Sequence, residues 1–515
     1  MKEKIALLTI LAPFSFSLFA QEGTLDPSFG TGGIVITDFE YASDVAYSMA
    51  LQDDGKMVVV GFSNLGPALR KDITMVRYDA DGVLDPSFGD GGKVITDIGG
   101  LEESDFAYDV AIQNDGKIVV TGTTIPDGGY KILVVRYNSD GSLDPTFGSG
   151  GYMETDFGGM EEIGQSVKIL DDGKIIVGGF RNDGLKRNFA LIKLNTDGTL
   201  DDSFGTGGKV YTSFAGDRHD SGYDVEIDNE GRIVLAGYSY VGTSSDFQFA
   251  LARYMPDGSL DATFDGDGKL LTDAGLLVGQ AYAMVLQPDN KIVVGGYGYY
   301  GFIADFAVVR YNQDGTLDPT FGVGGITHTD FGSNKDDWGF ALCLQPDGKI
   351  LLAGAAFDGS HNNVAIARYR VNGFLDPAFG GSGMVVTPIG PASEGAFSIL
   401  MQPDDRILIS GYTFQLGAND FLTARYNPVE LEESTADTYA ETYLQLSPNP
   451  CSDHLSIQSK YEGLATISDI TGAIVWRREI DPGVTYLSTQ SFAPGIYFLH
   501  LQGNEGVADL RFVKH

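Results

Sequence analysis

The side chains that most often do chemistry are scattered in this 515-residue chain. Its repeat region holds three histidines, His219, His328 and His361, without the spacing of a metal site. Neighbouring carboxylates occur at 102–103, 161–162 and 336–337, and such pairs act as acid and base in glycoside hydrolysis. Because the chain has 70 Asp and Glu residues, such pairs are also expected on a solvated surface. We find no Gly-x-Ser-x-Gly, His-Glu-x-x-His or P-loop motif, so the sequence predicts no catalytic residue.

One segment has carboxylates at a spacing that suits calcium. Asp79, Asp81 and Asp85 stand two and four residues apart, and Ca²⁺ prefers oxygen ligands. Other copies of this segment carry Asn, Met or Arg at the position of Asp79. Calcium binding here remains an alternative, and the sequence predicts no other cofactor.

A repeat of 57 to 60 residues must position whatever site the chain has. The hexapeptide Leu-Asp-Pro-Ser-Phe-Gly at 25–30 recurs, with substitutions, from Leu84, Leu143, Leu200, Leu260, Leu317 and Leu375. A strand that ends in Arg-Tyr also recurs, with Lys193-Leu194 as its most divergent copy. In the hexapeptide we expect Asp to cap a single helical turn, Pro to begin it and Gly to end it with positive φ.

Turn residues divide each repeat into four short strands. In one repeat we expect these at 281–287, 291–296, 306–311 and 325–330. The second strand is continuously apolar, as at 175–177, which indicates that both of its faces are buried between neighbouring sheets. Sheets stacked on both faces are typical of the blades of a β-propeller.

The sequence therefore predicts an all-β fold with a seven-bladed β-propeller over residues 21–428. The first hexapeptide lies so near the N-terminus that its copy supplies only a fourth strand, 33–39. The last copy supplies three strands and ends at Tyr426. We expect these fragments to pair as a seventh blade closed by the N-terminal strand, because an unclosed ring would expose sheet edges.

The hexapeptide and the tight turns resemble the delta-60 repeat family of bacterial secreted proteins, over residues 23–426. The resemblance implies a repeated β-structure and transfers no catalytic residue. The Arg and the hexapeptide Asp recur in the repeats, so we expect them to serve packing, with the Arg held against the Asp carboxylate.

The N-terminal sequence indicates where the protein is located, and its net charge limits the partners that it can bind. Lys2 and Lys4 precede an apolar run, 5–19, that ends at Ala20, a pattern typical of a signal peptide over residues 1–20. No later stretch is long and apolar enough to cross a bilayer, so we expect no transmembrane span in the mature protein. A net charge of −36 disfavours nucleic acid as a partner.

The C-terminal part of the chain has a different composition. Residues 429–443 are acidic and rich in hydroxyl groups, which indicates a linker, and residues 444–515 predict short strands of a small Ig-like β-sandwich. This unit resembles the type A C-terminal sorting domain of the type IX secretion system of Bacteroidetes. The motifs that carry the resemblance contain Pro448, Asn449, Pro450, Gly472, Gly495, Tyr497 and Lys514. The resemblance implies passage through the periplasm, contact with the type IX secretion machinery, and secretion or attachment at the outer-membrane surface.

Binding is expected where the repeats differ. If the strands alternate up and down, the tight turns of every repeat lie at one end of the ring and the variable connections at the other. In these connections we expect Tyr240, Tyr299, Tyr300 and Trp338 to offer flat faces that stack on sugar rings. Packing of these rings within their own loops remains the alternative.

The sequence thus favours a secreted or cell-surface binding or adhesion module for a neutral glycan or a protein ligand. Two other classes stay open: an extracellular enzyme that acts on polysaccharide or peptide, and a purely structural surface-layer protein. Polar residues from several blades that converge on the central channel would favour an enzyme. Aromatic residues gathered on one rim would favour a binding module.

Overall fold

The computed structural model divides the chain into two compact units, Met1–Pro428 and Val429–His515. The predicted signal peptide, 1–20, and the predicted linker, 429–443, lie outside the described residues. The described residues are 23–39, 43–65, 70–100, 103–214, 216, 218–241, 247–272, 278–301, 303–332, 335–415, 417–427, 444–447, 454–460, 462–469, 474–493, 495–503 and 506–514. Within these ranges the regular structure is β-strand, apart from a 3-10 turn, η1 (Pro126–Gly128).

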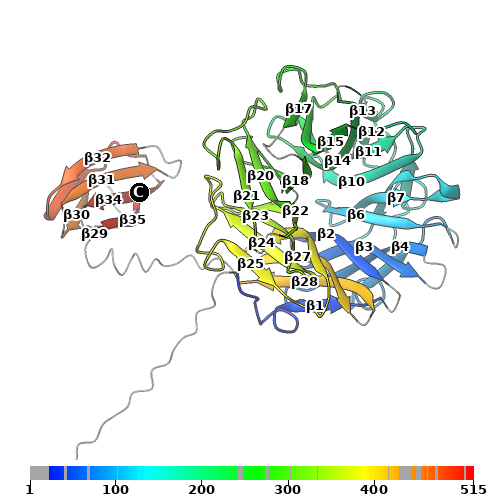
Figure 1. Ribbon diagram of the computed structural model, residues 1–515, viewed down its shortest axis with the longest axis horizontal. Coiled ribbons are helices and arrows are strands. Elements are labelled where there is room, and N and C mark those ends of the chain that lie inside the picture. Colours follow the sequence, from blue (N-terminus) through cyan, green and yellow to red (C-terminus); the bar gives the residue numbers. More distant parts are fainter. Residues whose placement is uncertain are drawn as a thin grey trace, which may run out of the picture. The chain divides into compact units, whose positions relative to one another are not determined.

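Seven four-stranded sheets stand around a central channel as the blades of a propeller (Figure 1). From blade 1 to blade 7, the innermost strands are β2 (Asp44–Leu51), β6 (Asp105–Ile112), β10 (Glu161–Ile169), β14 (Arg218–Ile227), β18 (Val278–Leu286), β22 (Asp337–Leu344) and β26 (Glu394–Met401). The second strands are β3 (Met57–Leu65), β7 (Ile118–Thr124), β11 (Ile175–Asn182), β15 (Ile233–Val241), β19 (Ile292–Tyr300), β23 (Ile350–Phe357) and β27 (Ile407–Gln415). The third strands are β4 (Arg70–Tyr78), β8 (Lys131–Tyr137), β12 (Arg187–Leu194), β16 (Phe247–Tyr254), β20 (Ile303–Tyr311), β24 (Asn362–Tyr369) and β28 (Ala418–Tyr426). The outer strands are β5 (Lys93–Thr96), β9 (Tyr152–Thr155), β13 (Lys209–Thr212), β17 (Lys269–Thr272), β21 (Ile326–Thr329), β25 (Met384–Thr387) and β1 (Ile34–Thr37).

The second strand of a blade is buried on both faces, as its continuous apolar run predicts. All seven residues of β7 are buried. Val120 of β7 shares one hydrophobic cluster with Val58 of β3 in the preceding blade, while Val119 belongs to a cluster with Val177 of β11 in the following blade. Neighbouring sheets therefore cover both faces of this strand, which is the environment that favours uninterrupted β-branched residues.

The hexapeptide forms a tight turn that holds its repeat together. In blade 5, Oδ1 of Asp318 accepts hydrogen bonds from the amide (3.0 Å) and the hydroxyl (2.7 Å) of Thr320. Phe321 is fully buried, and the Arg310 guanidinium lies 4.6 Å from the centre of its ring. Gly322 has φ +50°, and a Cβ there would lie 2.2 Å from a backbone oxygen, so only glycine fits this turn.

The repeated Arg and Asp serve packing, as predicted. Arg310 donates from Nε to Asp318 Oδ2 (2.9 Å) and from Nη1 to the carbonyl oxygen of Val371 (2.6 Å) in the next repeat. This Arg–Asp clasp recurs with Nε–Oδ2 distances of 2.8 to 3.0 Å in Arg77–Asp85, Arg136–Asp144, Arg253–Asp261, Arg368–Asp376 and Arg425–Asp26. In blade 3, Lys193 stands in its place, 3.8 Å from Asp201.

The Tyr that follows the Arg makes a second tie between blades. The Tyr311 hydroxyl of blade 5 donates to Thr272 Oγ1, at the end of β17 in blade 4, over 2.8 Å. The same buried bond occurs in Tyr78–Thr37, Tyr137–Thr96, Tyr254–Thr212, Tyr369–Thr329 and Tyr426–Thr387.

The seventh sheet contains both ends of the repeat region (Figure 1). β1 pairs antiparallel with β28, from Ile34 opposite Ala424 to Thr37 opposite Phe421. The Asp26 carboxylate accepts a hydrogen bond from Arg425 Nε over 2.8 Å. Residues almost 400 positions apart therefore share one blade.

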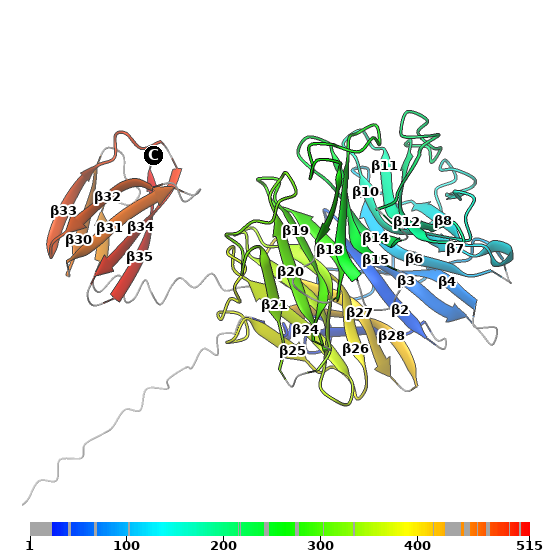
Figure 2. The ribbon, with the colours of Figure 1, turned by 45° about the horizontal axis from the view of Figure 1, so that its top comes forward.

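The second unit contains two sheets (Figure 2). One consists of β29 (Leu444–Ser447), β30 (His454–Ser459) and β33 (Gly483–Ser488). The other has the order β32 (Ile474–Ile480), β31 (Gly463–Asp469), β34 (Gly495–Gly503) and β35 (Gly506–Lys514). Ile457 of the first sheet and Leu499 of the second are fully buried in one hydrophobic cluster, so the two sheets share a core.

Three of the predicted sorting-motif residues lie in the second sheet. Gly495 of β34 pairs with Lys514 of β35, and the Tyr497 hydroxyl donates to the carbonyl oxygen of Ala493 over 2.8 Å. The remaining motif residues lie outside the described part of the chain: Pro448, Asn449, Pro450 and Gly472. Within the described residues, no helix is long and apolar enough to cross a bilayer.

Candidate functional site

The innermost strands surround a cavity of about 560 Å³ in the central channel. Each of these strands has a β-bulge, at which the register with the second strand skips one residue. In β18, the register passes from Ala281 to Ala283, and the skipped residue, Tyr282, lines the cavity. A bulge re-aims the side chain of its extra residue, so the backbone irregularity turns this ring into the channel.

The skipped residue is aromatic in six of the seven blades. In blade order, these residues are Tyr47, Tyr108, Gln165, Tyr223, Tyr282, Phe340 and Phe397. All seven line the cavity and are half-buried. We call the six aromatic members the aromatic collar.

The rings of the collar contact one another in sequence around the channel. The distances between ring centres for Tyr108–Tyr47, Tyr47–Phe397, Phe397–Phe340, Phe340–Tyr282 and Tyr282–Tyr223 are 5.2, 5.2, 5.1, 5.5 and 4.7 Å. Gln165 of blade 3 stands between Tyr223 and Tyr108 and interrupts the series. At the level of the bulges, the channel is therefore lined by six aromatic rings and one amide side chain.

A second layer of rings supports the collar from the second strands. Tyr297 stacks on Tyr282 with ring centres 5.7 Å apart, and Tyr412 stacks on Phe397 at 5.5 Å. The hydroxyls of Tyr282 and Tyr297 both donate to Gln280 Oε1, over 2.6 and 2.8 Å. Burial raises the pKa of the collar tyrosines Tyr47, Tyr108, Tyr223 and Tyr282, so the collar carries no charge near neutral pH.

Polar residues follow the collar residues directly in the sequence and also line the cavity. Asp109 accepts hydrogen bonds from the Ser48 hydroxyl (2.7 Å) and the Val167 amide (2.8 Å). Asp224 accepts from the Ser166 hydroxyl (3.0 Å) and the Met284 amide (2.7 Å). Each carboxylate thus joins the innermost strands of the blades on either side of its own.

Next to this layer, Lys168 and Glu226 form an ion pair of 2.8 Å at the cavity. Burial raises the pKa of the Asp224 carboxyl, and the Lys168 ammonium opposes part of this effect. Burial by itself would lower the pKa of Lys168, but the carboxylates of Glu226, Asp224 and Asp109 raise it above its usual value. Lys168 therefore remains charged and partly neutralises the carboxylates around it.

The aromatic residues predicted for the variable connections lie in strands, so that part of the prediction is wrong. Tyr240 lies in β15, Tyr299 and Tyr300 in β19, and Trp338 in β22. The reason is that strand pairing continues far beyond the apolar core of each hairpin, in blade 5 as far as Tyr300 opposite Ile303.

These rings pack mainly against their own blade. The Tyr240 ring lies 4.8 Å from His219 and 4.7 Å from Phe247, and Tyr299 meets Tyr297 edge-on at 6.0 Å. Trp338 is half-buried, and the side chain of Tyr300 lies outside the described set. Among described side chains, no ring contact joins Tyr240, Tyr299 and Trp338 to one another.

The predicted calcium segment uses its carboxylates internally. Oδ1 of Asp79 accepts the amides of Asp81 (3.0 Å) and Val83 (2.9 Å), which closes a turn. Oδ2 of Asp85 forms ion pairs with Arg77 Nε at 2.9 Å and with Lys56 Nζ at 3.2 Å. These contacts occupy oxygens that a calcium ion would need.

Sequence reasoning missed the collar, although its signal is visible in the chain. In six repeats an aromatic residue follows Ala or Gly in the middle of the first strand, as in Ala46-Tyr47 and Gly339-Phe340. A repeated residue predicts packing and a difference between repeats predicts binding, so this signal indicates the core of the blades and not a site. In the closed ring, however, the bulge residue of each innermost strand lines the channel.

Two family models match this chain. The first is described as a β-propeller domain of unknown function and matches seven segments, 52–88, 113–147, 170–204, 230–264, 287–321, 345–379 and 402–429. The second, a secretion system C-terminal sorting domain, matches residues 445–515. The chain joins a propeller repeat domain to a type IX sorting domain. The sorting domain implies secretion or attachment to the cell surface and interaction with the type IX secretion machinery.

No curated protein matches the sequence. Solved structures with a similar arrangement include a virginiamycin B lyase from Staphylococcus aureus, at 10% identity and TM-score 0.43, over 76% of this chain and 98% of that chain. Polysaccharide lyase Uly1 is 10% identical with TM-score 0.42, over 81% of this chain and 94% of that chain. PorZ, a surface component of the type IX secretion system of Porphyromonas gingivalis, is 12% identical with TM-score 0.34, over 91% of this chain and 59% of that chain. Similarities of this size carry no argument about activity.

Proposed function

We propose that this secreted chain is a binding module whose aromatic collar holds a neutral glycan in the central channel. The observation that carries the proposal is the series of ring contacts from Tyr108 to Tyr223 around a cavity of about 560 Å³. Cavities that hold small ligands typically measure about 300–1,000 Å³. Aromatic faces stack on sugar rings, and the tyrosine hydroxyls and Gln165 supply polar partners at the same level of the channel.

Charge supports a neutral ligand. The collar carries no charge, and the whole chain has a net charge of −36, which repels anions. Asp109, Asp224 and Glu226 lie next to the collar, and Lys168 is the one cation among the described residues that line the cavity. This excess of negative charge makes the channel unsuited to an acidic polysaccharide.

The experiment that tests this proposal is a glycan array on the purified full chain, followed by calorimetry with the glycan that binds. Tyr282→Ala should weaken binding at least about fivefold, because an aromatic contact is worth about 1 kcal/mol beyond the area that it buries. Tyr282→Phe keeps the ring and should retain most of the affinity.

The matched control is Tyr240→Ala, which removes a ring of similar burial outside the channel. It should leave the affinity unchanged. Full binding by the Tyr282→Ala protein, or a loss of binding in Tyr240→Ala alone, would show that the collar is not the site. Binding to proteins but to no glycan on the array would reassign the ligand class.

An enzyme acting on polysaccharide is the second candidate, because Asp109, Lys168 and Asp224 converge on the channel from three blades. The raised pKa of Asp224 is a property of general acids. The amide and hydroxyl donors that already bind Asp109 and Asp224 favour a structural role instead. Turnover of a bound glycan that Asp224→Asn abolishes without loss of binding would establish the enzyme.

The pairing of β1 with β28 and the Arg425–Asp26 contact support a further proposal, that the N-terminal strand closes the ring. The two sheets with a common core support an Ig-like sandwich for residues 444–515. In this proposal the sandwich is the part that the secretion machinery recognises after passage through the periplasm.

A further inference from the structure

Three carboxylates meet at the boundary between blades 5 and 6. Asp305 belongs to β20, Asp330 directly follows β21, and Asp337 begins β22. One oxygen of each lies within 4.8 Å of the corresponding oxygens of the other two. Asp305 and Asp337 are only 9% and 1% exposed, so two negative charges of this cluster are removed from water.

The hydrogen bonds at this cluster leave its charge uncompensated. Asp330 accepts the amide of Gly332 (2.7 Å) and Asp337 accepts the amide of Phe331 (2.9 Å), which fixes the direction of both carboxylates. Oδ1 of Asp305 is buried and has no hydrogen-bond partner among the described residues. In the part of the chain that the structure describes, no Lys or Arg forms an ion pair with any of the three. A buried carboxylate without a partner is costly, so either a proton or a bound cation must relieve this cost.

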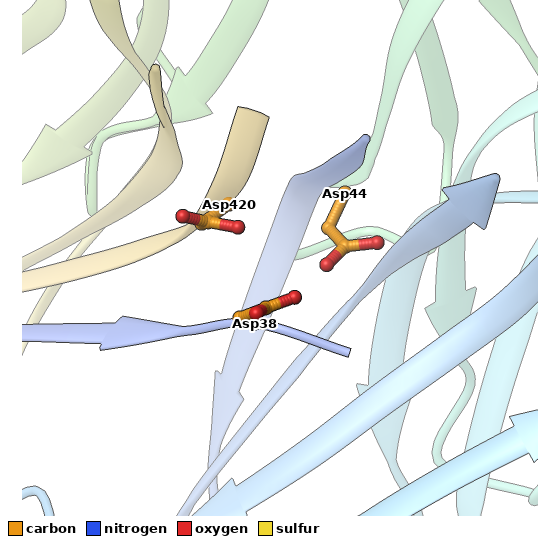
Figure 3. Close-up of side chains that lie close together, drawn as sticks. All are labelled: Asp38, Asp44 and Asp420. Atoms are coloured by element: carbon orange, nitrogen blue, oxygen red, sulfur yellow. The ribbon is translucent and has the colours of Figure 1, made fainter. Parts of the chain in front are cut away.

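The same arrangement occurs at two other boundaries, where a basic side chain contacts either the carboxylates or the backbone beside them. Between blades 1 and 2, Arg70 binds Asp72 (2.6 Å) and Asp97 (3.1 Å), which gather with Asp105. Between blades 7 and 1, the carboxylates of Asp38, Asp44 and Asp420 surround a common space (Figure 3). There the Lys93 ammonium donates to the backbone oxygen of Asp38 over 2.6 Å.

Between blades 5 and 6, apolar residues replace both of these basic side chains. Ile303 begins β20 two residues before Asp305, as Arg70 begins β4 two residues before Asp72. Met384 begins β25 as Lys93 begins β5. The cluster at Asp305 thus keeps the carboxylates and lacks both the Arg that binds two of them between blades 1 and 2 and the Lys that contacts the backbone between blades 7 and 1.

From this comparison we propose that Asp305, Asp330 and Asp337 bind one Ca²⁺ ion. Only oxygen ligands are present, which selects a hard cation, and oxygens that lie within 4.8 Å of one another are close enough to share one ion, for which Ca–O distances are about 2.3–2.6 Å. Mg²⁺ demands near-ideal octahedral geometry and gives up its water reluctantly, whereas Ca²⁺ accepts irregular sets of carboxylates, so we expect Ca²⁺ to be preferred. The ion joins β20 and β21 of blade 5 to β22 of blade 6, as Arg70 joins its neighbours in blades 1 and 2. This metal site is independent of the collar and of the glycan proposal.

The test uses the purified full chain, stripped with EDTA and dialysed into buffer at pH 7.5. Titration with CaCl₂ should reveal one site per chain. At a free calcium concentration of 100 times the dissociation constant, the melting temperature should rise by about 3 °C over the EDTA sample. MgCl₂ at the same concentration should give a smaller rise, and an equal rise would overturn the assignment to calcium.

Substitutions at Asp305 separate calcium binding from a general loss of stability. Asp305→Asn should lose the calcium response and, in EDTA, melt at or above the temperature of the parent, because one of the mutually repelling charges is gone. Asp305→Lys imitates blade 2, where Lys131 stands at this position, and should be stable without calcium. The matched control is Asp72→Asn, which should retain the calcium response and melt lower, because it leaves Arg70 without its closest carboxylate.

Three results would overturn the proposal. They are no binding heat with calcium, an unchanged calcium response in Asp305→Asn, and a lower melting temperature of both Asp305 variants in EDTA.

Discussion

Asp26 offers the sharpest test of how the propeller is held together. Its Oδ2 receives Arg425 Nε at 2.8 Å and Arg406 Nε at 3.0 Å, while its Oδ1 accepts the amide and the hydroxyl of Ser28 at 3.0 and 2.7 Å. The Arg425 side chain is only 3% exposed. In Asp26→Ala this guanidinium stays buried and keeps its hydrogen bonds to the Ser28 hydroxyl and the Ala80 carbonyl and its contact with the Phe29 ring.

The expected loss follows from these contacts. Removing one partner of a buried ion pair costs about 3–5 kcal/mol, and the two hydrogen bonds that Arg425 retains place this case at the lower end, about 3 kcal/mol. The second partner, Arg406, is 34% exposed and adds little, since water replaces its carboxylate. We therefore expect Asp26→Ala to lower the free energy of unfolding by about 3 kcal/mol in urea titrations.

Asp318→Ala is the matched control, because Asp318 makes the same contacts, with Arg310 at 2.9 Å and Lys291 at 3.1 Å, inside a continuous blade. Both variants lose a clasp, but only Asp26→Ala also loosens β1, which has just four residues paired with β28. Amide exchange in β28 should therefore accelerate in Asp26→Ala and stay unchanged in Asp318→Ala. Equal exchange in the two variants would refute closure by β1, and a loss below 1 kcal/mol in both would refute the energetic role of the clasp.

Three further results are expected. Tyr311→Phe should cost about 1–2 kcal/mol in urea unfolding, because it removes a buried hydrogen bond between blades, whereas Tyr211→Phe, at an exposed ring, should cost nothing measurable. Hydrogen bonds, first of all from Lys174, lower the pKa of Asp201 to about 2, below its unfolded value of about 3.9. The ionised Asp201 carboxylate thus contributes fully to the free energy of unfolding above pH 4, and this contribution should be lost as the pH falls from 4 to 2. Unfolding followed by circular dichroism measures this loss. Unchanged stability at pH 2 would contradict the prediction. Removing residues 444–515 should leave a folded propeller in the periplasm, and normal amounts of the truncated protein outside the cell would disprove the role of the sorting domain.

The repeat made the architecture predictable. Continuous apolar runs such as 175–177 and turn residues such as those of the hexapeptide act over a few positions, so they specify strands and turns without knowledge of the rest of the chain. The partnership of the repeated Arg and Asp was also accessible, because two opposite charges that recur together are expected to meet. The strand ends were less predictable, since pairing extends to Tyr300 through backbone hydrogen bonds that the side chains do not announce.

The candidate sites depend on contacts between blades. Tyr47 and Phe397 are 350 residues apart in sequence, yet their rings stack at 5.2 Å because both occupy the bulge of an innermost strand in adjacent blades. The carboxylates of Asp305 and Asp337 meet only because β22 packs beside β20.

The sequence alone determined the all-β repeat, its four strands, the acidic character of the chain and the sorting motif, since each of these is written in local patterns of residue type. Only the tertiary structure decided which rings line the channel and which carboxylates lack a basic partner, because burial and neighbouring charge arise when separate blades come together.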